Sequence, residues 1–186
     1  MLETRWHLIR HAPVDNPEGR IYGSSDKSAN TSNANAFQLL AQRLPREGIA
    51  ITSHLRRTQQ TLDALISGGL KVSAQIIENR LGEQDFGDWE GKLFSELPDL
   101  GLLGNEDLAN FSPPNGESFK DVCDRVKPII VEISKIALNA PVLVICHAGT
   151  IRAAIAMALE NYSIPLKFEI NNLSLTRIRV LSETQY

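Results

Sequence analysis

Hydrophobic and polar positions along the chain fall into two alternating patterns. Short apolar runs that stop at polar or turn-forming residues predict buried strands, and apolar residues three or four positions apart predict amphipathic helices. The predicted strands are Trp6–Arg10, Gly48–Ser53, Val72–Ile77, Val142–Cys146 and Leu175–Leu181. The predicted helices are Ala34–Leu44, Thr58–Ile66, Phe119–Leu138 and Thr150–Leu159. Pro128 is expected to kink the third of these helices or to mark its first part.

This alternation predicts an α/β protein with a three-layer α/β/α sandwich and a mostly parallel central sheet. The last strand is expected to be an antiparallel edge strand. With 186 residues, no internal repeat and no linker-like stretch, residues 1–186 are expected to form a single domain. An irregular segment at about 92–118 is expected to be a lid or insertion that packs on the body of the domain. Its apolar side chains are Leu93, Phe94, Leu97, Leu100, Leu102, Leu103, Leu108 and Phe111.

Composition narrows the class of protein. Hydrophobic residues at 42% and charged residues at 22% are ordinary for a soluble globular protein, and the net charge of −3 argues against non-specific binding to nucleic acid. The chain has no apolar signal core near Met1 and no apolar run of the ~20 residues needed to span a bilayer. Its two cysteines cannot make a disulfide framework. We therefore expect a cytoplasmic protein without a membrane partner.

Two of the predicted strands stop at a histidine, His11 after Arg10 and His147 after Cys146. Parallel α/β sheets place their chemistry at the carboxyl ends of strands, so both imidazoles can share one site. A neutral imidazole can attack phosphorus if one ring nitrogen is held as a donor and the other is left bare. The guanidinium of Arg10 matches the geometry of phosphate oxygens. The pattern indicates nucleophilic catalysis on an anion.

Three further segments carry candidate chemistry. The stretch from Ser53 to Thr61 runs from a strand end into a helix, where free backbone N–H groups favour an anion. The turn-rich loop 81–91 contains a carboxylate, Glu83, that can protonate a leaving oxygen. After His147, the small residues Ala148 and Gly149 are expected to let a phosphate approach a helix N-terminus.

Together, these segments resemble the histidine phosphatase superfamily, also called the phosphoglycerate mutase-like family. The resemblance runs from about Trp6 to Ala153, with the motifs in the family's order. It implies a phosphoglycerate mutase-like fold, in which one histidine becomes phosphorylated. The catalytic set that the resemblance implies is His11, Glu83, His147, Arg10 and Arg57.

Each of these residues takes a role from the family pattern. His11 matches the phosphorylated histidine, with Arg10 beside it. Glu83 matches the acid, and His147 matches the second histidine, which holds phosphoryl oxygens. Arg57, rather than Arg56, matches the family's middle arginine because it stands four residues after the motif's serine.

The phosphate loop departs from the family pattern. The usual Arg-His-Gly continues here as Ala12, and the usual asparagine six residues after the first histidine is Pro17, so Asn16 is expected to substitute for it. The expected phosphate- and substrate-binding set is Arg10, Asn16, Gly23, Ser24, Arg57, His147 and Ala148. Ser118 has two interpretations, as a pocket residue with Glu117 or as the N-cap of the long helix.

The resemblance implies a phosphoric monoester hydrolase of the histidine acid phosphatase type, working through a phosphohistidine on His11. It implies that the protein needs no cofactor and no metal. The expected partner is a small phosphomonoester and not a nucleic acid, and the resemblance is compatible with a homodimer. The stretch Gly19–Gly23 and the loop Asp85–Glu90 look most like α-ribazole phosphatases.

Three alternatives stay open at this point. They are a phosphoglycerate mutase, a phosphatase for phosphohistidine on signalling proteins, and a catalytically weak phosphate-binding or interaction module on the same fold. Turnover of a phosphoester would separate the last from the others.

Overall fold

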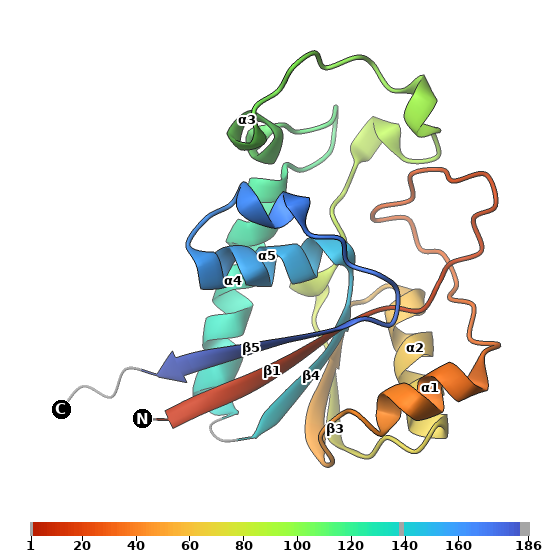
Figure 1. Ribbon diagram of the computed structural model, residues 1–186, viewed down its shortest axis with the longest axis vertical. Coiled ribbons are helices and arrows are strands. Elements are labelled where there is room, and N and C mark those ends of the chain that lie inside the picture. Colours follow the sequence, from red (N-terminus) through yellow and green to blue (C-terminus); the bar gives the residue numbers. More distant parts are fainter. Residues whose placement is uncertain (1, 138–139, 183–186) are drawn as a thin grey trace.

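The computed structural model describes residues 2–137 and 140–182, and within them five strands form one sheet in the order β3-β2-β4-β1-β5 (Figure 1). The strands are β1 (Leu2–Arg10), β2 (Gly48–Thr52), β3 (Val72–Ile77), β4 (Pro141–Cys146) and β5 (Leu175–Ser182). The α-helices are α1 (Ala34–Ala41), α2 (Arg56–Ser67), α3 (Asn105–Asn110), α4 (Phe119–Ile136) and α5 (Ala148–Leu159). All the strands and helices predicted from periodicity are present, which confirms the mixed α/β class.

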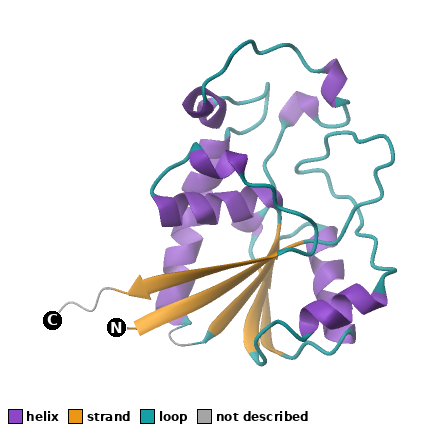
Figure 2. Ribbon diagram, in the orientation of Figure 1, coloured by secondary structure: helices purple, strands orange, loops and turns teal. Residues whose placement is uncertain are grey.

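The helices form layers on the two faces of this sheet (Figure 2). Side chains alternate along β1: Trp6 and Leu8 pack in a cluster with residues of α4 and α5, and Ile9 packs in a second cluster with residues of α1 and α2. The predicted three-layer α/β/α arrangement is therefore correct. Within the described residues, no helix is both long and apolar enough to cross a membrane.

The strand directions also follow the prediction. β1 pairs parallel with β4, β2 pairs parallel with β4 and with β3, and β5 pairs antiparallel with β1 at the edge. Parallel strands bring the ends of β1, β2 and β4 to one edge of the sheet, and the loops after these strands carry the candidate site.

The long helix α4 runs through its proline, as the predicted helix did. It contains Pro128 and continues to Ile136, although proline removes one helical hydrogen bond. Burial of the next two side chains, Ile129 and Ile130, offsets that loss. Ser118 is the N-cap: its hydroxyl accepts a hydrogen bond from the Asp121 N–H at 3.1 Å. The predicted end at Leu138 lies outside the described residues.

The segment 92–118 is less tightly packed than predicted. It contains a short helix, α3, where the sequence pattern indicated only irregular structure. The body contact is made by Ala109 of α3, which is buried, and by Phe111, whose ring stacks on Trp89 with centroids 5.4 Å apart. The expectation that all eight apolar side chains pack on the body is wrong for four of them. Phe94, Leu102, Leu103 and Leu108 are exposed. Proline and glycine interrupt the segment, so its apolar residues share no single face that could be buried.

Candidate active site

The register between β1 and β4 places the two candidate histidines side by side. Arg10 is opposite Cys146 in this parallel pair, and the N–H of His11 donates to the carbonyl of Cys146 at 2.9 Å. His11 and His147 follow these paired residues, and their ring centroids are 5.2 Å apart. The site thus forms where two buried strands end together, as their patterns predicted.

The ring of His11 is held with one nitrogen tied down. Its Nδ1 donates to the carbonyl of Ala12 at 2.7 Å, and in the described part of the chain Nε2 makes no hydrogen bond. Burial, followed by the charges of the Arg57 and Arg10 guanidinium groups, lowers the pKa of His11 to about 3, although the bond to the Ala12 carbonyl raises it. His11 is therefore neutral at physiological pH, with an unprotonated Nε2, which is the state of an imidazole nucleophile.

His147 is also neutral, and both of its nitrogens have partners. Arg57 Nε donates to His147 Nδ1 at 3.3 Å, so Nδ1 is the acceptor. The ring proton is then on Nε2, 2.8 Å from Ser53 Oγ. Complete burial, with the charge of Arg57 as the next cause, holds the pKa of His147 well below its usual range. An oxyanion at His147 has to exchange with one of these two partners.

Arg57 anchors the loop that closes over the histidines. Its Nη1 and Nη2 groups donate to the carbonyls of Ser25 at 2.7 Å and Gly23 at 2.6 Å. The guanidinium carbon, Cζ, lies 5.2 Å from the centre of the Tyr22 ring. The side chain is fully buried. With the bond from Nε to His147, Arg57 makes three hydrogen bonds. A guanidinium has five N–H groups, so two remain. The Tyr22 ring also meets His11 edge-on, with centroids 6.5 Å apart.

Glu83 approaches the same site from the loop after β3. Its Oε1 accepts hydrogen bonds at 3.0 Å from the N–H of Gly149, in the first turn of α5, and at 3.0 Å from that of Gln84. A Cβ at position 149 would lie 2.4 Å from Oε1, so glycine is required for this contact. No hydrogen bond reaches Oε2 from the described residues, which leaves that oxygen able to exchange a proton with a bound ester. Gly149, two positions after His147, therefore admits the carboxylate of Glu83, where the sequence suggested a phosphate.

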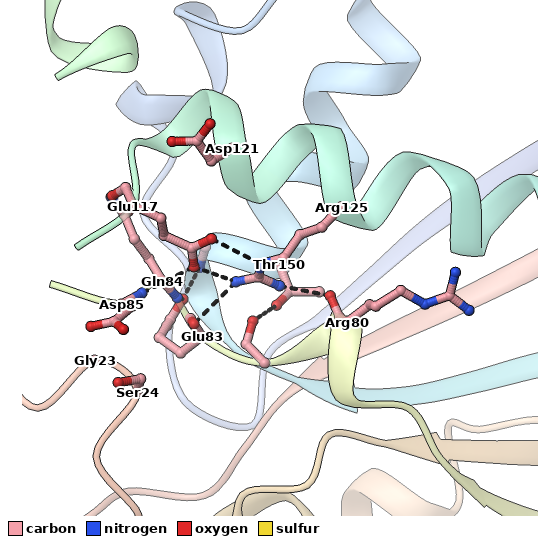
Figure 3. A network of polar contacts seen from close by, with 12 residues as sticks. Gly23, Ser24, Arg80, Glu83, Gln84, Asp85, Glu117, Asp121, Arg125 and Thr150 are labelled. Carbon is pink, nitrogen blue, oxygen red and sulfur yellow. Dashed lines mark hydrogen bonds and ion pairs between the residues drawn. The ribbon is translucent and has the colours of Figure 1, made fainter. Parts of the chain in front are cut away.

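A polar network behind Glu83 fixes its backbone (Figure 3). Arg125 of α4 forms an ion pair with Glu117 at 2.7 Å, and its Nη2 also donates to the carbonyl of Glu83 at 3.1 Å. Glu117 in turn accepts from the N–H of Asp85 at 3.0 Å, and its carbonyl accepts from the Gln84 side chain at 2.9 Å. Glu83 and the two residues after it are thus attached to Glu117, just before α4, and to Arg125 within α4. A surface cleft of about 400 Å³ lies against this network and is lined in part by Glu83, Glu117 and Arg125.

The remaining predicted residues have other contacts. Arg10 donates from Nη1 to the carbonyl of Ile170 at 2.5 Å, and its buried Nε has no partner among the described residues. The amide of Asn16 closes its own turn through two bonds to the Arg20 backbone. Ser24 donates from Oγ to Glu90 at 2.9 Å. Ala148 opens α5 directly after His147. Asn16 and Ser24 therefore stabilise the loop, and their polar groups are engaged there.

Several contributing residues were not assigned from sequence. Asn172 donates to the carbonyl of His11 at 2.8 Å, and Thr61 Oγ1 accepts from the N–H of Ala12 at 2.9 Å. Glu90 accepts from the backbone N–H groups of Ser24 and Ser25 at 2.6 and 2.9 Å. Thr61 and Glu90 lie within the motifs 53–61 and 81–91, and this position could have identified them as residues that support the site. Asn172 lies far beyond the motifs and gave none.

Cations are the main electrostatic feature around His11. The positive charges of Arg57 and Arg10 both lower the pKa of His11. Within residues 2–137 and 140–182, no three His, Cys, Asp or Glu side chains gather where they could hold a metal ion. The arrangement can bind an oxyanion between guanidinium groups, attack it with a neutral imidazole, and exchange a proton with it through a carboxylate.

Comparison with known proteins gives a consistent result. The model of a family described as the histidine phosphatase superfamily (branch 1) matches residues 6–185. The bovine protein 6-phosphofructo-2-kinase/fructose-2,6-bisphosphatase 1 is 32% identical over 171 residues, which are 87% of this chain and 34% of the relative. The chain therefore spans about a third of the length of these two-activity relatives. Phosphoserine phosphatase 1 of Hydrogenobacter thermophilus is 34% identical over 153 residues, 78% of this chain and 72% of the relative.

Solved structures support the fold. A mycobacterial glucosyl-3-phosphoglycerate phosphatase has a TM-score of 0.79 and 25% identity, covering 95% of this chain and 90% of the other. A protein of Escherichia coli K-12 proposed to be an α-ribazole-5′-P phosphatase has the same TM-score of 0.79 at 24% identity, covering 96% and 91%. The likeness to the second structure concerns the fold alone.

Proposed function

The chain belongs to the histidine phosphatase superfamily, and we propose that it hydrolyses a small phosphomonoester through a phosphohistidine intermediate on His11. The observation that carries this proposal is the state of His11. Its Nδ1 is held by the Ala12 carbonyl, its pKa is lowered to about 3, mainly by burial and then by two guanidinium charges, and its Nε2 has no hydrogen bond in the described chain. An imidazole in this state is a nucleophile aimed away from its anchored nitrogen.

The first step transfers the phosphoryl group to the enzyme. The Nε2 lone pair of His11 attacks phosphorus, the bond from phosphorus to the ester oxygen breaks, and Glu83 gives a proton from Oε2 to the departing oxygen. The charge that develops on the other phosphoryl oxygens is met by Arg10 and by the two N–H groups of Arg57 that the loop does not use. The buried Nε of Arg10 is a further donor without a partner among the described residues.

The second step releases phosphate. Glu83, now a carboxylate, takes a proton from water, and the water oxygen attacks phosphorus as the bond from phosphorus to Nε2 breaks. His11 returns to its neutral form and orthophosphate leaves. His147 contributes to the oxyanion site when Nδ1 leaves Arg57 and the ring proton moves from Nε2 to Nδ1, with the Ser53 hydroxyl donating to Nε2; Nδ1 then donates to a phosphoryl oxygen. Each charge-assisted hydrogen bond of this kind contributes about 1.5–3 kcal/mol.

The names of the relatives suggest which esters to test. They act on phosphoserine, glucosyl-3-phosphoglycerate and fructose 2,6-bisphosphate, according to those names, and the sequence resembles α-ribazole phosphatases. We include all four in the proposed range, with a single phosphoryl group removed from a metabolite. The open cleft beside Glu83 supports a leaving group that extends away from the histidines.

The test compares the wild type with His11→Ala and Glu83→Gln on these four esters and on 3-phosphoglycerate. Release of orthophosphate by the wild type, lost by several orders of magnitude in His11→Ala with the circular dichroism spectrum unchanged, is the expected result. Conversion of 3-phosphoglycerate into its isomer without release of phosphate would instead indicate a mutase. Binding of phosphate without turnover of any ester would indicate a binding module.

A further inference from the structure

One face of the strand pair β1–β5 gathers positively charged side chains. Antiparallel pairing places Arg5 directly opposite Arg179 and His7 directly opposite Arg177. Directly opposite residues project from the same face of a sheet, so these four side chains lie together. It is the face on which Ile9 packs toward α1 and α2, but both helices lie near β3 and β4, away from the N-terminal half of β1 (Figure 1).

This arrangement is unfavourable for folding alone. Like charges on directly opposite strand positions destabilise a sheet, and Arg5 and Arg179 form such a pair, with Arg177 adding a third guanidinium opposite His7 at the next position on this face. The anion beside them is Glu3, which contacts Arg5 at 2.6 Å and lies 3.9 Å from Arg179. One carboxylate cannot neutralise three guanidinium groups, so the face retains positive charge.

A cavity of about 390 Å³ opens on this face and is lined by Glu3, Arg5, His7, Pro45, Ala140 and Pro141. His7 has 9% of its surface exposed, and its buried Nδ1 has no hydrogen-bond partner among the described residues. A buried polar atom without a partner is costly, and a native structure normally satisfies it with water or a ligand. Arg177 of β5 lies beside this cavity: it stands opposite the lining residue His7, and its Nη2 donates at 3.5 Å to the carbonyl of Arg43, two residues before the lining residue Pro45.

We propose that this cavity is a second anion-binding site, separate from the histidine pair at the other end of β1, which takes a ligand bearing a phosphate group. Guanidinium groups match tetrahedral oxyanions in geometry and charge, and His7 offers a ring nitrogen without a partner in the part of the chain that the structure describes. The ligand would offset the repulsion between the strands and satisfy the buried nitrogen together. Inorganic phosphate is the simplest ligand of this chemistry, and a phosphorylated metabolite is the other source.

Binding at this site is coupled to the protonation of His7. Burial first, then the charges of Arg177 and Arg5, lower the pKa of His7, while backbone carbonyls act against them. The charged groups on the two strands facing it are Glu3 and Arg5 on β1 and Arg177 and Arg179 on β5, whereas β4 presents Pro141 and Leu143. A bound anion beside His7 favours the protonated ring, so the pKa of His7 rises on binding.

The experiment follows the histidine ring protons by NMR while inorganic phosphate is titrated into the wild-type protein, with the His7 signal assigned from His7→Gln. Arg177→Gln tests the site without altering a buried residue, and Lys135→Gln, which removes an exposed charge from α4, is its matched control. The same titration with glycerol 2-phosphate in His11→Ala, where turnover is blocked, separates free phosphate from a phosphorylated metabolite.

The expected result is a saturable shift of the His7 signal in the wild type and in Lys135→Gln, with a pKa of His7 about one unit higher at saturation, equivalent to about tenfold tighter binding by the protonated form. Arg177→Gln should bind at least about tenfold more weakly. A His7 signal that stays still while the His11 and His147 signals move would overturn the proposal. Equal affinity in Arg177→Gln and the wild type would also overturn it. Because phosphate at the catalytic site is read from other histidines, failure here is distinguishable from failure of the proposed reaction.

Discussion

Arg125 holds the backbone of Glu83, and its replacement by alanine should impair proton transfer more than phosphoryl transfer. The guanidinium makes the ion pair with Glu117 at 2.7 Å and donates to the carbonyls of Glu83 at 3.1 Å and Arg80 at 2.6 Å. Arg125→Ala removes all of these contacts without touching the histidines. Glu83 then keeps only its own bonds to the N–H groups of Gly149 and Gln84.

The size of the effect can be worked from these contacts. The pair is about one-quarter exposed on each side, at 23% and 22%, so its loss should cost less than the ~3–5 kcal/mol typical of a fully buried pair, about 2 kcal/mol in unfolding free energy. A displacement of a catalytic group by ~1 Å can reduce the rate about 100-fold. We therefore expect kcat for an alkyl phosphate, whose leaving group needs a proton, to fall about 100-fold.

The assay compares two esters in one buffer. With p-nitrophenyl phosphate, the leaving group is a weak base and departs without a proton. The rate of phosphoryl transfer to His11, measured as p-nitrophenol released in the first turnover, should therefore stay within about threefold of the wild type in Arg125→Ala. Hydrolysis of the phosphohistidine needs Glu83 with either ester. Arg80→Ala is the control, because its exposed side chain pairs with Glu78 and Glu132 while its carbonyl is kept. An equal loss in the first-turnover rate on both esters would refute the positioning role, since only proton transfer to the leaving group depends on which ester is used. No loss on either ester would refute it as well.

Three further predictions follow from individual contacts. Gly149→Ala should displace Glu83, because the added Cβ would lie 2.4 Å from Oε1, and should lower kcat on an alkyl phosphate about 10- to 100-fold, with Ala148→Gly as the control; unchanged kinetics would contradict the contact. Asn172→Ala should lower the unfolding free energy measured in urea by about 1 kcal/mol, through the lost bond to the His11 carbonyl, whereas the exposed Asn171→Ala should leave it unchanged. The pKa of His11 is lowered from 6.5 to about 3, so the folded state binds fewer protons than the unfolded state in this range; its contribution to stability is complete above pH 6.5 and is lost as the pH falls toward about 3. Urea midpoints of the wild type should therefore fall more steeply over this range than those of His11→Asn, and parallel curves would contradict the buried neutral ring.

Much of the site was predictable because strands and sheet edges obey simple rules. Apolar runs that end at His11 and His147 place both residues at one edge of a parallel sheet, and the register of β1 with β4 brings them within 5.2 Å. Arg57 follows from the same rule, since it lies in the first turn of the helix after β2. The motif spacing and the sheet pattern agree at these positions, and the structure brings the three side chains together.

The rest depends on contacts between distant segments, which local patterns do not encode. Asn172 meets His11 only because β5 returns beside β1. Gly149 is needed because a loop from 66 residues earlier brings a carboxylate to the helix start. Ser24 has a hydroxyl that could donate to a phosphate, but this hydroxyl already donates to the carboxylate of Glu90. The apolar residues of segment 92–118 resemble core positions in sequence, and their exposure follows from the lack of a shared face.

The central claim is that His11 carries the phosphoryl group during turnover. The most direct measurement mixes the wild type with excess p-nitrophenyl phosphate, quenches the reaction in alkali within the first turnovers, and determines the site of any added phosphoryl group by mass spectrometry. His11→Asn and His54→Asn, which changes an exposed histidine outside the paired rings, are treated in the same way. We predict a transient phosphoryl group on His11 in the wild type and in His54→Asn, and no adduct and no turnover in His11→Asn. Continued turnover by His11→Asn, or an adduct on another residue, would contradict the account.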